Sequence, residues 1–416
     1  MRNHLPRKTT LPIRSVDQAC TPMPALLRGL VLAATLLPAT AAETITIVSS
    51  LPRTGSANAQ TTTIVNGIRL AIEQAGNRVG NFTVKYEDWD DASPERGAWD
   101  PSVEAANARK AVADPSVVAY IGTYNSGAAK IAMPILNQAE LVMVSPGNTY
   151  TGLTKPGLGE KTEPSCYRPS GKVTYFRVVP ADDVQGTVGA TWAAEMGVKK
   201  AFVLHDRELY GKGLADIFQS AAPQKGIQVV GVEGIDGKAA NYRSLVTKIR
   251  ASGADLVYFG GTTQTNAGQL AKDLLAGGLG KVRYMVPDGC FEKAFIEAAG
   301  AAALEGRTFI TFGGVPPERL TGRGAEFVAD YRKAYKAEPE AYAAYGYEAA
   351  SVVLDGIMRA RSRERSAITA AVAKTQDFHG VLGTWSFDRN GDTTLKLASG
   401  NTVKNGQFEF VKVLGE

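Results

Sequence analysis

Residues 114–154, DPSVVAYIGTYNSGAAKIAMPILNQAELVMVSPGNTYTGLT, contain the pattern that decides the fold. The run 117–121 is short, apolar and β-branched and is bounded by a proline and a glycine, which is typical of a buried parallel strand. Residues 128–136 carry apolar side chains at helical spacing, and 141–144 form the next apolar run. The order strand, turn, helix, strand predicts a parallel α/β unit.

A polar turn follows each of these two strands. The first turn, 125–127, reads Asn-Ser-Gly, and the second, 147–149, reads Gly-Asn-Thr. Carboxyl ends of adjacent parallel strands meet at one edge of a sheet, where open α/β sheets bind ligands, and a helix N-terminus favours anions. The two turns could therefore hold one small carboxylate through hydroxyls and backbone amides. The alternative is that Ser126 only caps its helix and Thr149 only shapes a loop.

The alternation of strands and helices covers most of the chain and restarts once. Strands are expected at 43–50 and 81–88 before the quoted stretch, and at 173–179 after it, where the first series ends at Pro180. The second series has expected elements at 185–196, 200–204, 213–222, 228–231, 242–251, 255–259, 266–276 and 283–286. Two such series predict two doubly wound sheets, which are Rossmann-like α/β lobes.

The C-terminal part departs from this alternation. Amphipathic helices are expected at 325–335 and 344–359. Residues 380–387 and 407–413 are interpreted as antiparallel strands joined across Asn390-Gly391.

The first 42 residues resemble a secretory signal. Arg28 precedes an apolar run, 29–37, and the small residues of 39–42 suit a signal peptidase. The run is too short to span a bilayer. We therefore expect export, with cleavage near Ala41-Ala42 and with Met23 as an alternative start; an anchor that is never cut is the competing interpretation.

The net charge of +5 arises mainly from this segment. Its five basic residues face one acidic residue, so the rest of the chain has 41 basic and 40 acidic residues. No stripe of Lys and Arg with interleaved aromatic residues remains, which excludes a nucleic-acid-binding protein.

Motifs of catalysis and metal binding are missing from the sequence. There is no G-x-S-x-G, H-E-x-x-H, Walker A or dinucleotide-binding glycine motif in the required context, and only His205 and His379 follow the signal segment. Residues 388–392 resemble half a calcium loop without its terminal Glu, which favours a hairpin turn. Cys166 and Cys290 are expected in different lobes and are predicted to be unpaired. We expect no enzyme activity, no cofactor and no metal.

Other residues suit the binding of a small zwitterion. Asp288 follows the strand 283–286 and could pair with an ammonium group, or it could cap an expected helix at 291–299. Tyr210 and Tyr347 could line a cleft or could pack in the core. An anion cradle on one lobe and an acid on the other would clamp an amino acid.

Several motifs in this order resemble the type I periplasmic solute-binding proteins of ABC importers, particularly the branched-chain amino acid binding family. They are Thr54-Gly55, AYIGTYNSGAA, SPGNTYTGLT, YFRVVP, HDRELYGKGLA, DLVYFGG, the acid of VPDG and GTWSFDRNGD, and the resemblance covers 43–416. It implies two α/β lobes joined by a hinge of three segments. Lobe 1 would comprise 43–180 and 313–379, lobe 2 would comprise 181–312, and 380–416 would supply C-terminal strands of lobe 2 and a hinge crossing.

The resemblance also implies a set of ligand-binding residues. The carboxylate would be held by Ser126 and Thr149 with backbone groups at Gly147, and the ammonium by Asp288. Tyr210 and Tyr347 would line the cleft. Gln60 and Thr262 would also line it, at positions where these amino acid binders carry aromatic residues. Those two departures permit a ligand that is larger or more polar than leucine.

Together these features predict a monomeric, periplasmic substrate-binding protein of an ABC transporter that delivers a branched-chain or related amino acid to a membrane permease. Within this class, the alternative ligands are amides, urea-like compounds and aromatic carboxylates. Outside it, the alternatives are a sensing partner of a signalling receptor and a hydrolase that uses His205.

Overall fold

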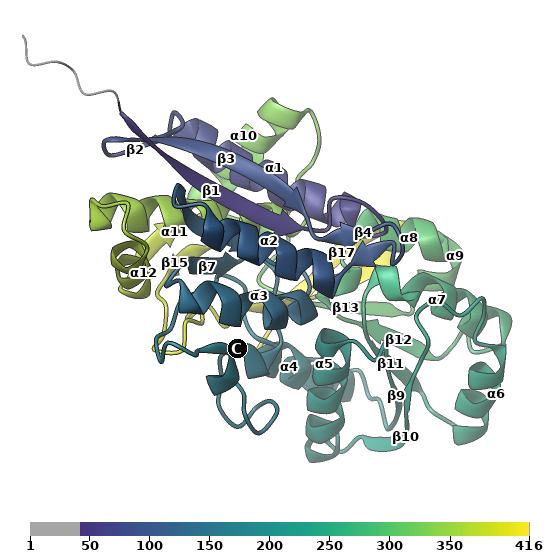
Figure 1. Cartoon of the computed structure of the whole chain (residues 1–416). Coiled ribbons are helices and arrows are strands. Elements are labelled where there is room, and N and C mark those ends of the chain that lie inside the picture. Colours follow the sequence, from purple (N-terminus) through teal and green to yellow (C-terminus); the bar gives the residue numbers. More distant parts are fainter. Residues whose placement is uncertain (1–41, 416) are drawn as a thin grey trace, which may run out of the picture. The chain divides into compact units, whose positions relative to one another are not determined.

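The computed structural model describes residues 42–415. The predicted signal segment, the cleavage site near Ala41-Ala42 and the alternative start at Met23 lie outside the described residues. Residues 42–415 form one compact unit that contains two large sheets, each covered by helices (Figure 1). We call the first sheet with its helices lobe 1 and the second sheet with its helices lobe 2.

Lobe 1 is built on a six-stranded sheet. Its strands are β1 (Glu43–Leu51), β2 (Arg78–Val79), β3 (Phe82–Asp90), β6 (Val117–Gly122), β7 (Val142–Ser145) and β8 (Tyr175–Arg177). Their order is β2-β3-β1-β6-β7-β8, and all neighbours are parallel except β2 and β3. Its helices are α1 (Asn58–Gln74), α2 (Pro101–Ala113), α3 (Ser126–Gln138), α10 (Arg323–Tyr335), α11 (Ala343–Ala360) and α12 (Arg365–Ala373). A short pair, β4 (Ala92–Ser93) and β5 (Ala98–Trp99), precedes α2.

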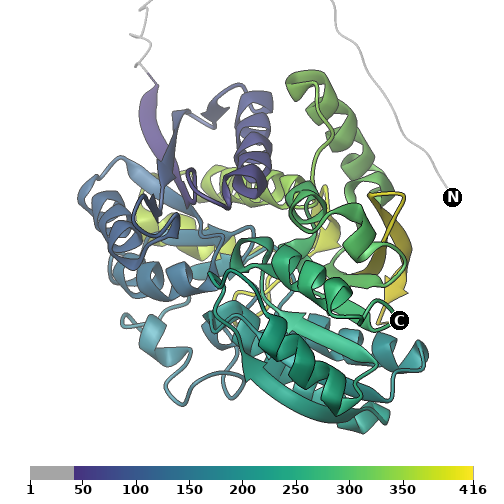
Figure 2. The same cartoon turned by 90° about the vertical axis from the view of Figure 1, so that its right-hand side faces the viewer.

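Lobe 2 is built on a seven-stranded sheet. Its strands are β9 (Lys200–His205), β10 (Gln228–Gly234), β11 (Leu256–Gly260), β12 (Arg283–Val286), β13 (Thr308–Gly313), β16 (Ala398–Lys404) and β17 (Gln407–Leu414). The order is β10-β9-β11-β12-β13-β16-β17, with β16 and β17 antiparallel at one edge (Figure 2). Its helices are α4 (Asp182–Glu195), α5 (Leu209–Ala221), α6 (Arg243–Ser252), α7 (Ala267–Ala276), α8 (Lys293–Ala299) and α9 (Ala301–Leu304). The fold class predicted from the sequence is confirmed.

Buried strands explain why the sequence pattern is informative. Every residue of β6 and β7 is buried, as expected for central parallel strands that are covered on both faces.

The residues of α1 and α11 that meet include glycines, which allow the two helices to approach closely. A Cβ atom at Gly67 would lie 2.1 Å from the Ala343 carbonyl oxygen, and one at Gly346 would lie 2.2 Å from that of Ile64. This contact fixes α11, from late in the chain, on lobe 1.

The chain passes between the lobes at three places. It leaves lobe 1 between Arg177 and Asp182, returns after Gly313, and enters lobe 2 again before Ala398. These three crossings connect the two sheets.

The predicted pairing of the C-terminal strands is wrong. Residues 380–387 do not pair with 407–413; instead β14 (Phe378–Gly380) pairs with β15 (Gly383–Trp385), and β16 pairs with β17. The turn between β16 and β17 is Asn405-Gly406, whose φ angles are both positive, as a type I′ turn requires. The other Asn-Gly pair, Asn390-Gly391, lies in a loop that contacts lobe 1, because Asp392 of this loop pairs with Arg177.

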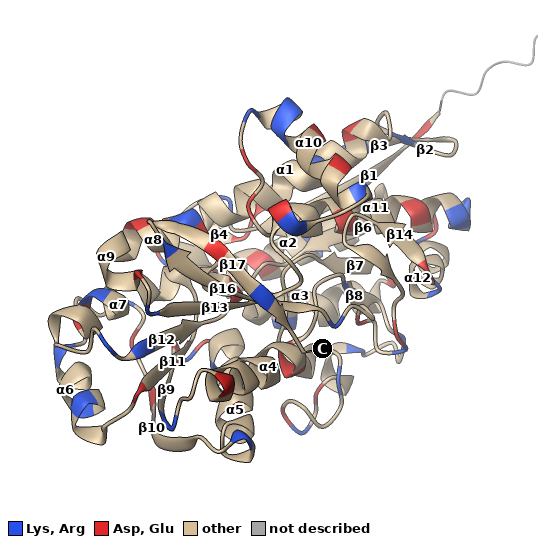
Figure 3. Cartoon of the chain, turned by 180° about the vertical axis from the view of Figure 1, so that it is seen from behind, with Lys and Arg blue, Asp and Glu red and all other residues tan. Residues whose placement is uncertain are grey.

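Charged residues of both signs are interspersed over the two lobes (Figure 3). Within residues 42–415, no helix is long and apolar enough to cross a membrane. Cys166 is exposed and Cys290 is buried, and both are free thiols.

Candidate functional site

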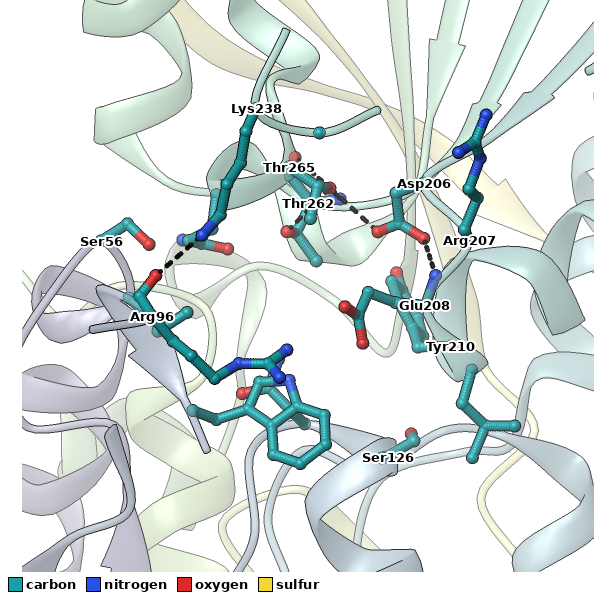
Figure 4. A pocket seen from close by; sticks show the side chains of 18 of the residues that line it. Ser56, Arg96, Ser126, Asp206, Arg207, Glu208, Tyr210, Lys238, Thr262 and Thr265 are labelled. Carbon is teal, nitrogen blue, oxygen red and sulfur yellow. Dashed lines mark hydrogen bonds between the residues drawn. The ribbon is translucent and has the colours of Figure 1, made fainter. Parts of the chain in front are cut away.

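Two adjoining cavities lie where the polar turns of lobe 1 face the strand ends of lobe 2. The smaller has a volume of about 20 Å³ and the larger about 250 Å³. Asn125, Ser126, Tyr210 and Thr262 line both of them, so they form one space, which we call the cleft. Figure 4 shows the larger cavity, with Ser126 on the lobe 1 side and Tyr210 and Thr262 on the lobe 2 side.

The lobe 1 wall brings together the two predicted turns. Ser126 is 2% exposed, and its hydroxyl accepts a hydrogen bond from the Tyr150 backbone N–H at 3.3 Å. It therefore links the two turns and makes no capping hydrogen bond within its own helix. Gly147 lines the small cavity. The Thr149 hydroxyl is buried without a hydrogen-bond partner, while its carbonyl accepts from the Asp182 N–H at 2.9 Å.

A buried ion pair holds the second turn in place. The Arg177 Nε donates to Asp392 Oδ1 at 2.6 Å, and its Nη1 donates to the carbonyls of Asn148 and Tyr150 at 3.2 and 2.8 Å. Arg177 is fully buried, and its charge helps to lower the pKa of Asp392 although burial acts in the opposite direction. Because Thr149 lies between the two bound carbonyls, this guanidinium sets the position of the turn.

The lobe 2 wall carries a buried acid, Asp288. Its Oδ1 accepts from Gln185 Nε2 at 2.7 Å and from the Tyr210 hydroxyl at 2.6 Å, and its Oδ2 accepts from the Tyr342 hydroxyl. Burial raises the pKa of Asp288, and these hydrogen bonds act to lower it. The predicted helix starts at Lys293 with Glu292 as its N-cap residue, so Asp288 does not cap it.

Asp182 is a second buried acid next to this wall. It lies in the first turn of α4 and is fully buried, and the one side-chain donor that acts on its carboxylate is the nearby Thr149 hydroxyl. Burial, with a further contribution from the charge of Asp288, raises its pKa well above the ordinary value. Two acids that are both buried next to one cleft favour a ligand with a positively charged group.

The larger cavity has polar walls towards its mouth (Figure 4). The Arg96 guanidinium lies 5.5 Å from the centre of the Trp99 ring, and Lys238 of lobe 2 donates to the Arg96 carbonyl of lobe 1 at 3.2 Å. Asp206 accepts from Thr265 at 2.9 Å, and burial raises its pKa to about 7. The hydrogen bond from Lys238 to the Arg96 carbonyl therefore joins the two lobes at the larger cavity.

Three of the predicted residues, Thr149, Tyr347 and Gln60, lie outside the lining of these cavities. Tyr347 donates to Gln74 Oε1 at 2.6 Å, and its ring packs against Phe327 at 5.1 Å, between α11, α1 and α10. Gln60 is fully buried in α1, and both of its amide atoms lack a partner. The structure thus brings together Ser126, Gly147, Tyr210, Thr262 and Asp288 in the lining. Thr149 lies behind the lining, where its carbonyl accepts from the Asp182 N–H.

The sequence analysis missed Tyr342, Gln185 and Asp182. Tyr342 and Tyr345 are three residues apart and share a helix face, whereas Tyr347 projects from another face. The motif AYAAYGYE therefore contains the tyrosine that lines the small cavity, Tyr342, but choosing it over Tyr347 required the packing of α11. Asp182 and Gln185 are also three apart, at a helix start just after Pro180, and this spacing was a usable signal.

Metal ligation finds no support among residues 42–415, where no group of three or more His, Cys, Asp or Glu side chains is suitably placed. The cleft lining instead offers hydroxyls, backbone groups and the carboxyls of Asp206, Glu208, Asp236 and Asp288.

Comparison with known proteins gives consistent results. A profile described as "Periplasmic binding protein" matches residues 44–400. A relative from Brucella abortus, named Leu/Ile/Val-binding protein homolog 2, is 30% identical over 349 residues, which are 83% of this chain and 86% of the relative.

Solved structures share the fold. A leucine binding protein, LivK from Thermotoga maritima, superposes with a TM-score of 0.79 at 26% identity, covering 89% of this chain and 99% of that protein. A solute binding protein of an ABC transporter from R. palustris, in complex with benzoate, superposes with a TM-score of 0.74 at 19% identity, covering 89% and 96% of the two chains. Both superpositions cover 89% of this chain and therefore include both of its lobes.

Proposed function

The chain belongs to the periplasmic binding protein family, and from this premise we propose that it is the substrate-binding component of an ABC transporter. It captures a small amino acid between its lobes and delivers it, as a monomer, to a membrane permease. A branched-chain amino acid is the first candidate ligand, because the Brucella relative is named for leucine, isoleucine and valine. The protein catalyses no reaction in this proposal.

The observation that carries the proposal is the pairing of a carboxylate cradle with buried acids across one cleft. The ligand carboxylate accepts from the Ser126 hydroxyl near the start of α3, where the helix dipole favours an anion. Gly147 lines this position, and its own N–H is already donated to Ser145 Oγ at 3.1 Å. The ligand ammonium lies towards Asp288. A carboxylate offers about four acceptor positions, and three are used on Asp288, so Oδ2 can accept one N–H of the ligand.

Asp182 is buried behind the lobe 2 wall, where the negative charges of Asp182 and Asp288 disfavour each other. A ligand ammonium close to Asp288 would offset this repulsion. With the ligand bound, closure of the lobes buries its charges against fixed partners, and the permease recognises the closed form.

A carboxylate ligand without an amine is the second candidate. The hydrogen bonds from Gln185, Tyr210 and Tyr342 already satisfy much of Asp288, which favours this ligand type over a dedicated ammonium site. The benzoate-bound R. palustris protein also illustrates that one fold serves both classes of ligand.

Isothermal titration of refolded, ligand-free protein separates the two candidates. L-Leucine, 4-methylpentanoate, which lacks the amine, and benzoate are compared on the wild type and on Ser126→Ala and Asp288→Asn. We expect leucine to bind best, with a loss of roughly tenfold or more in each variant, because hydrogen bonds to charged groups are removed. Asp288→Asn leaves the binding of 4-methylpentanoate unchanged. Tight binding of benzoate but not of leucine would instead select the second candidate.

A further inference from the structure

A second cavity, larger than the cleft, lies between residues of both lobes. Its volume of about 670 Å³ is within the range of small-molecule sites. It shares no lining residue with the two cavities of the cleft. We call it the side cavity. The wall residues on which its chemistry depends are Phe291, Glu292, Ile296, Pro317, Glu340 and Phe408.

One part of its wall is apolar. The rings of Phe291 and Phe408 meet edge to face with centres 4.7 Å apart, and Ile296 and Pro317 extend this surface. Such a surface suits an aromatic or branched aliphatic body of a ligand.

The rest of the wall is acidic. Five glutamates line the side cavity, against one lysine and one arginine. The arginine, Arg332, is already paired with Glu338 at 2.7 Å. The lining therefore has an excess of negative charge, which favours a cation over a neutral or anionic ligand.

Glu292 lacks the partners that a buried carboxyl normally has. The residue is 2% exposed, and Oε1 accepts from Nε2 of Gln264, a residue of the cleft lining, at 2.7 Å. Oε2 has no partner at hydrogen-bond distance, although the Thr263 hydroxyl is close enough to lower the pKa of the carboxyl. Burial raises its pKa to about 7, and it also raises the pKa of Glu340 on the lobe 1 side of the same cavity. A buried polar group without a partner is costly, so a donor that reached Glu292 would be stabilised.

We propose that the side cavity binds an organic cation, namely a primary amine on an aromatic or branched apolar body. Its ammonium lies between Glu292 and Glu340, and its body lies against Phe291 and Phe408. The site is distinct from the cleft and does not depend on the identity of the cleft ligand.

Isothermal titration of the full chain with 2-phenylethylamine tests this site, with 2-phenylethanol as the uncharged analogue of the same shape. We expect the amine to bind and the alcohol to bind at least about tenfold more weakly, because it lacks the charge-assisted hydrogen bonds. Glu292→Gln and Glu340→Gln should each weaken amine binding by a similar factor. Two controls should leave it unchanged: Ser126→Ala in the cleft, and Glu409→Gln on β17, an exposed acid paired with Lys404.

Three results would overturn the proposal: no amine binding at millimolar concentration, equal binding of amine and alcohol, or loss of binding in Ser126→Ala, which would place the amine in the cleft. If Glu292→Gln fails to fold by circular dichroism, the half-buried Glu340 carries the same test. A failure of leucine to bind the cleft leaves these outcomes unaffected, so the two proposals fail separately.

Discussion

The hydroxyl groups of Tyr342 and Tyr347 differ in what they contact, although only five residues separate them. At about 100° per residue they project roughly 140° apart on the helix. Tyr342 donates to Asp288 in the cleft, and Tyr347 donates to Gln74 on the outer side of lobe 1. They form a matched pair of one chemical type, one within the site and one outside it.

Tyr342→Phe is expected to weaken ligand binding by roughly tenfold, because Asp288 loses one of three hydrogen bonds that orient it. Tyr347→Phe is expected to leave the affinity unchanged. The dissociation constants of both variants, measured by isothermal titration with whichever of L-leucine, 4-methylpentanoate and benzoate binds the wild type best, test this. Equal losses in the two variants would contradict the placement of the cleft.

Arg177 and Asp392 form a buried ion pair that also fixes a turn of lobe 1, since Arg177 binds the carbonyls on both sides of Thr149. Asp392→Ala leaves a guanidinium buried without its counter-ion. We expect a loss of about 3–5 kcal/mol in the free energy of unfolding, measured by urea denaturation.

The control for this prediction is Glu338→Ala, which leaves Arg332 unpaired on the surface. It is expected to have no measurable effect, because exposed ion pairs contribute little. A small effect of Asp392→Ala would show that the turn is held in place by other contacts.

At the scale of elements, α5 of lobe 2 lies against the Tyr150 ring of lobe 1 at Gly213. A Cβ atom at Gly213 would lie 2.7 Å from Tyr150 Cδ2, which is too close for an unshifted contact. The ring cannot move freely, because its hydroxyl donates to Glu163 at 3.0 Å. The glycine therefore allows α5 of lobe 2 to lie this close to the Tyr150 ring of lobe 1.

Gly213→Ala is expected to reduce ligand affinity by roughly tenfold, since the clash opposes closure of the lobes. The unfolding midpoint of the ligand-free protein should change little. Gly189→Ala in α4 is the matched control, because its Cβ would meet atoms at 3.6 Å or more. Unchanged affinity in Gly213→Ala would show that the ligand-bound lobes do not use this contact.

The elements that could be predicted from the sequence are those with a local signal. Apolar runs such as 117–121 and 141–144 correspond to β6 and β7, because burial on both faces leaves a continuous apolar pattern. The pairing of the C-terminal strands could not be predicted correctly, because Asn-Gly, the typical sequence of a hairpin turn, occurs at both 390–391 and 405–406. Only the pairing of Asp392 with the distant Arg177 decides between them.

The cleft was predictable to the extent that its residues follow strand ends. Ser126, Gly147 and Asp288 do so, and the topology of a parallel sheet brings them to one edge. Tyr342 belongs instead to the start of α11, which reaches the cleft only because it packs on α1. Packing between helices that are far apart in the sequence leaves no local sequence pattern. The sequence therefore could not show which of the tyrosines of α11 lines the cleft.

At the scale of the whole molecule, contacts across the cleft link the lobes through groups of different chemistry. They include the hydrogen bond of Tyr342 to Asp288, that of Lys238 to the Arg96 carbonyl, and the pair of Lys155 with Asp183 at 2.7 Å. The two lobes also bury several acids. Burial raises the pKa of Glu104 to about 8 and that of Asp206, Glu292 and Glu348 to about 7.

These buried acids predict that stability falls as the pH rises through the neutral range. Between about pH 4.5 and 7, the folded protein holds protons that the unfolded chain has released, so raising the pH favours unfolding. We expect the melting temperature to be highest near pH 5 and to fall by roughly 5 °C or more by pH 8. Below pH 4 the trend reverses, because the pKa of Asp392 is lowered in the folded state and its stabilising charge is lost. Scanning calorimetry from pH 3 to 8 measures both limbs. Glu348→Gln should flatten the limb between pH 5 and 8, and a melting temperature that rises from pH 5 to 8 would contradict the assignment of these acids.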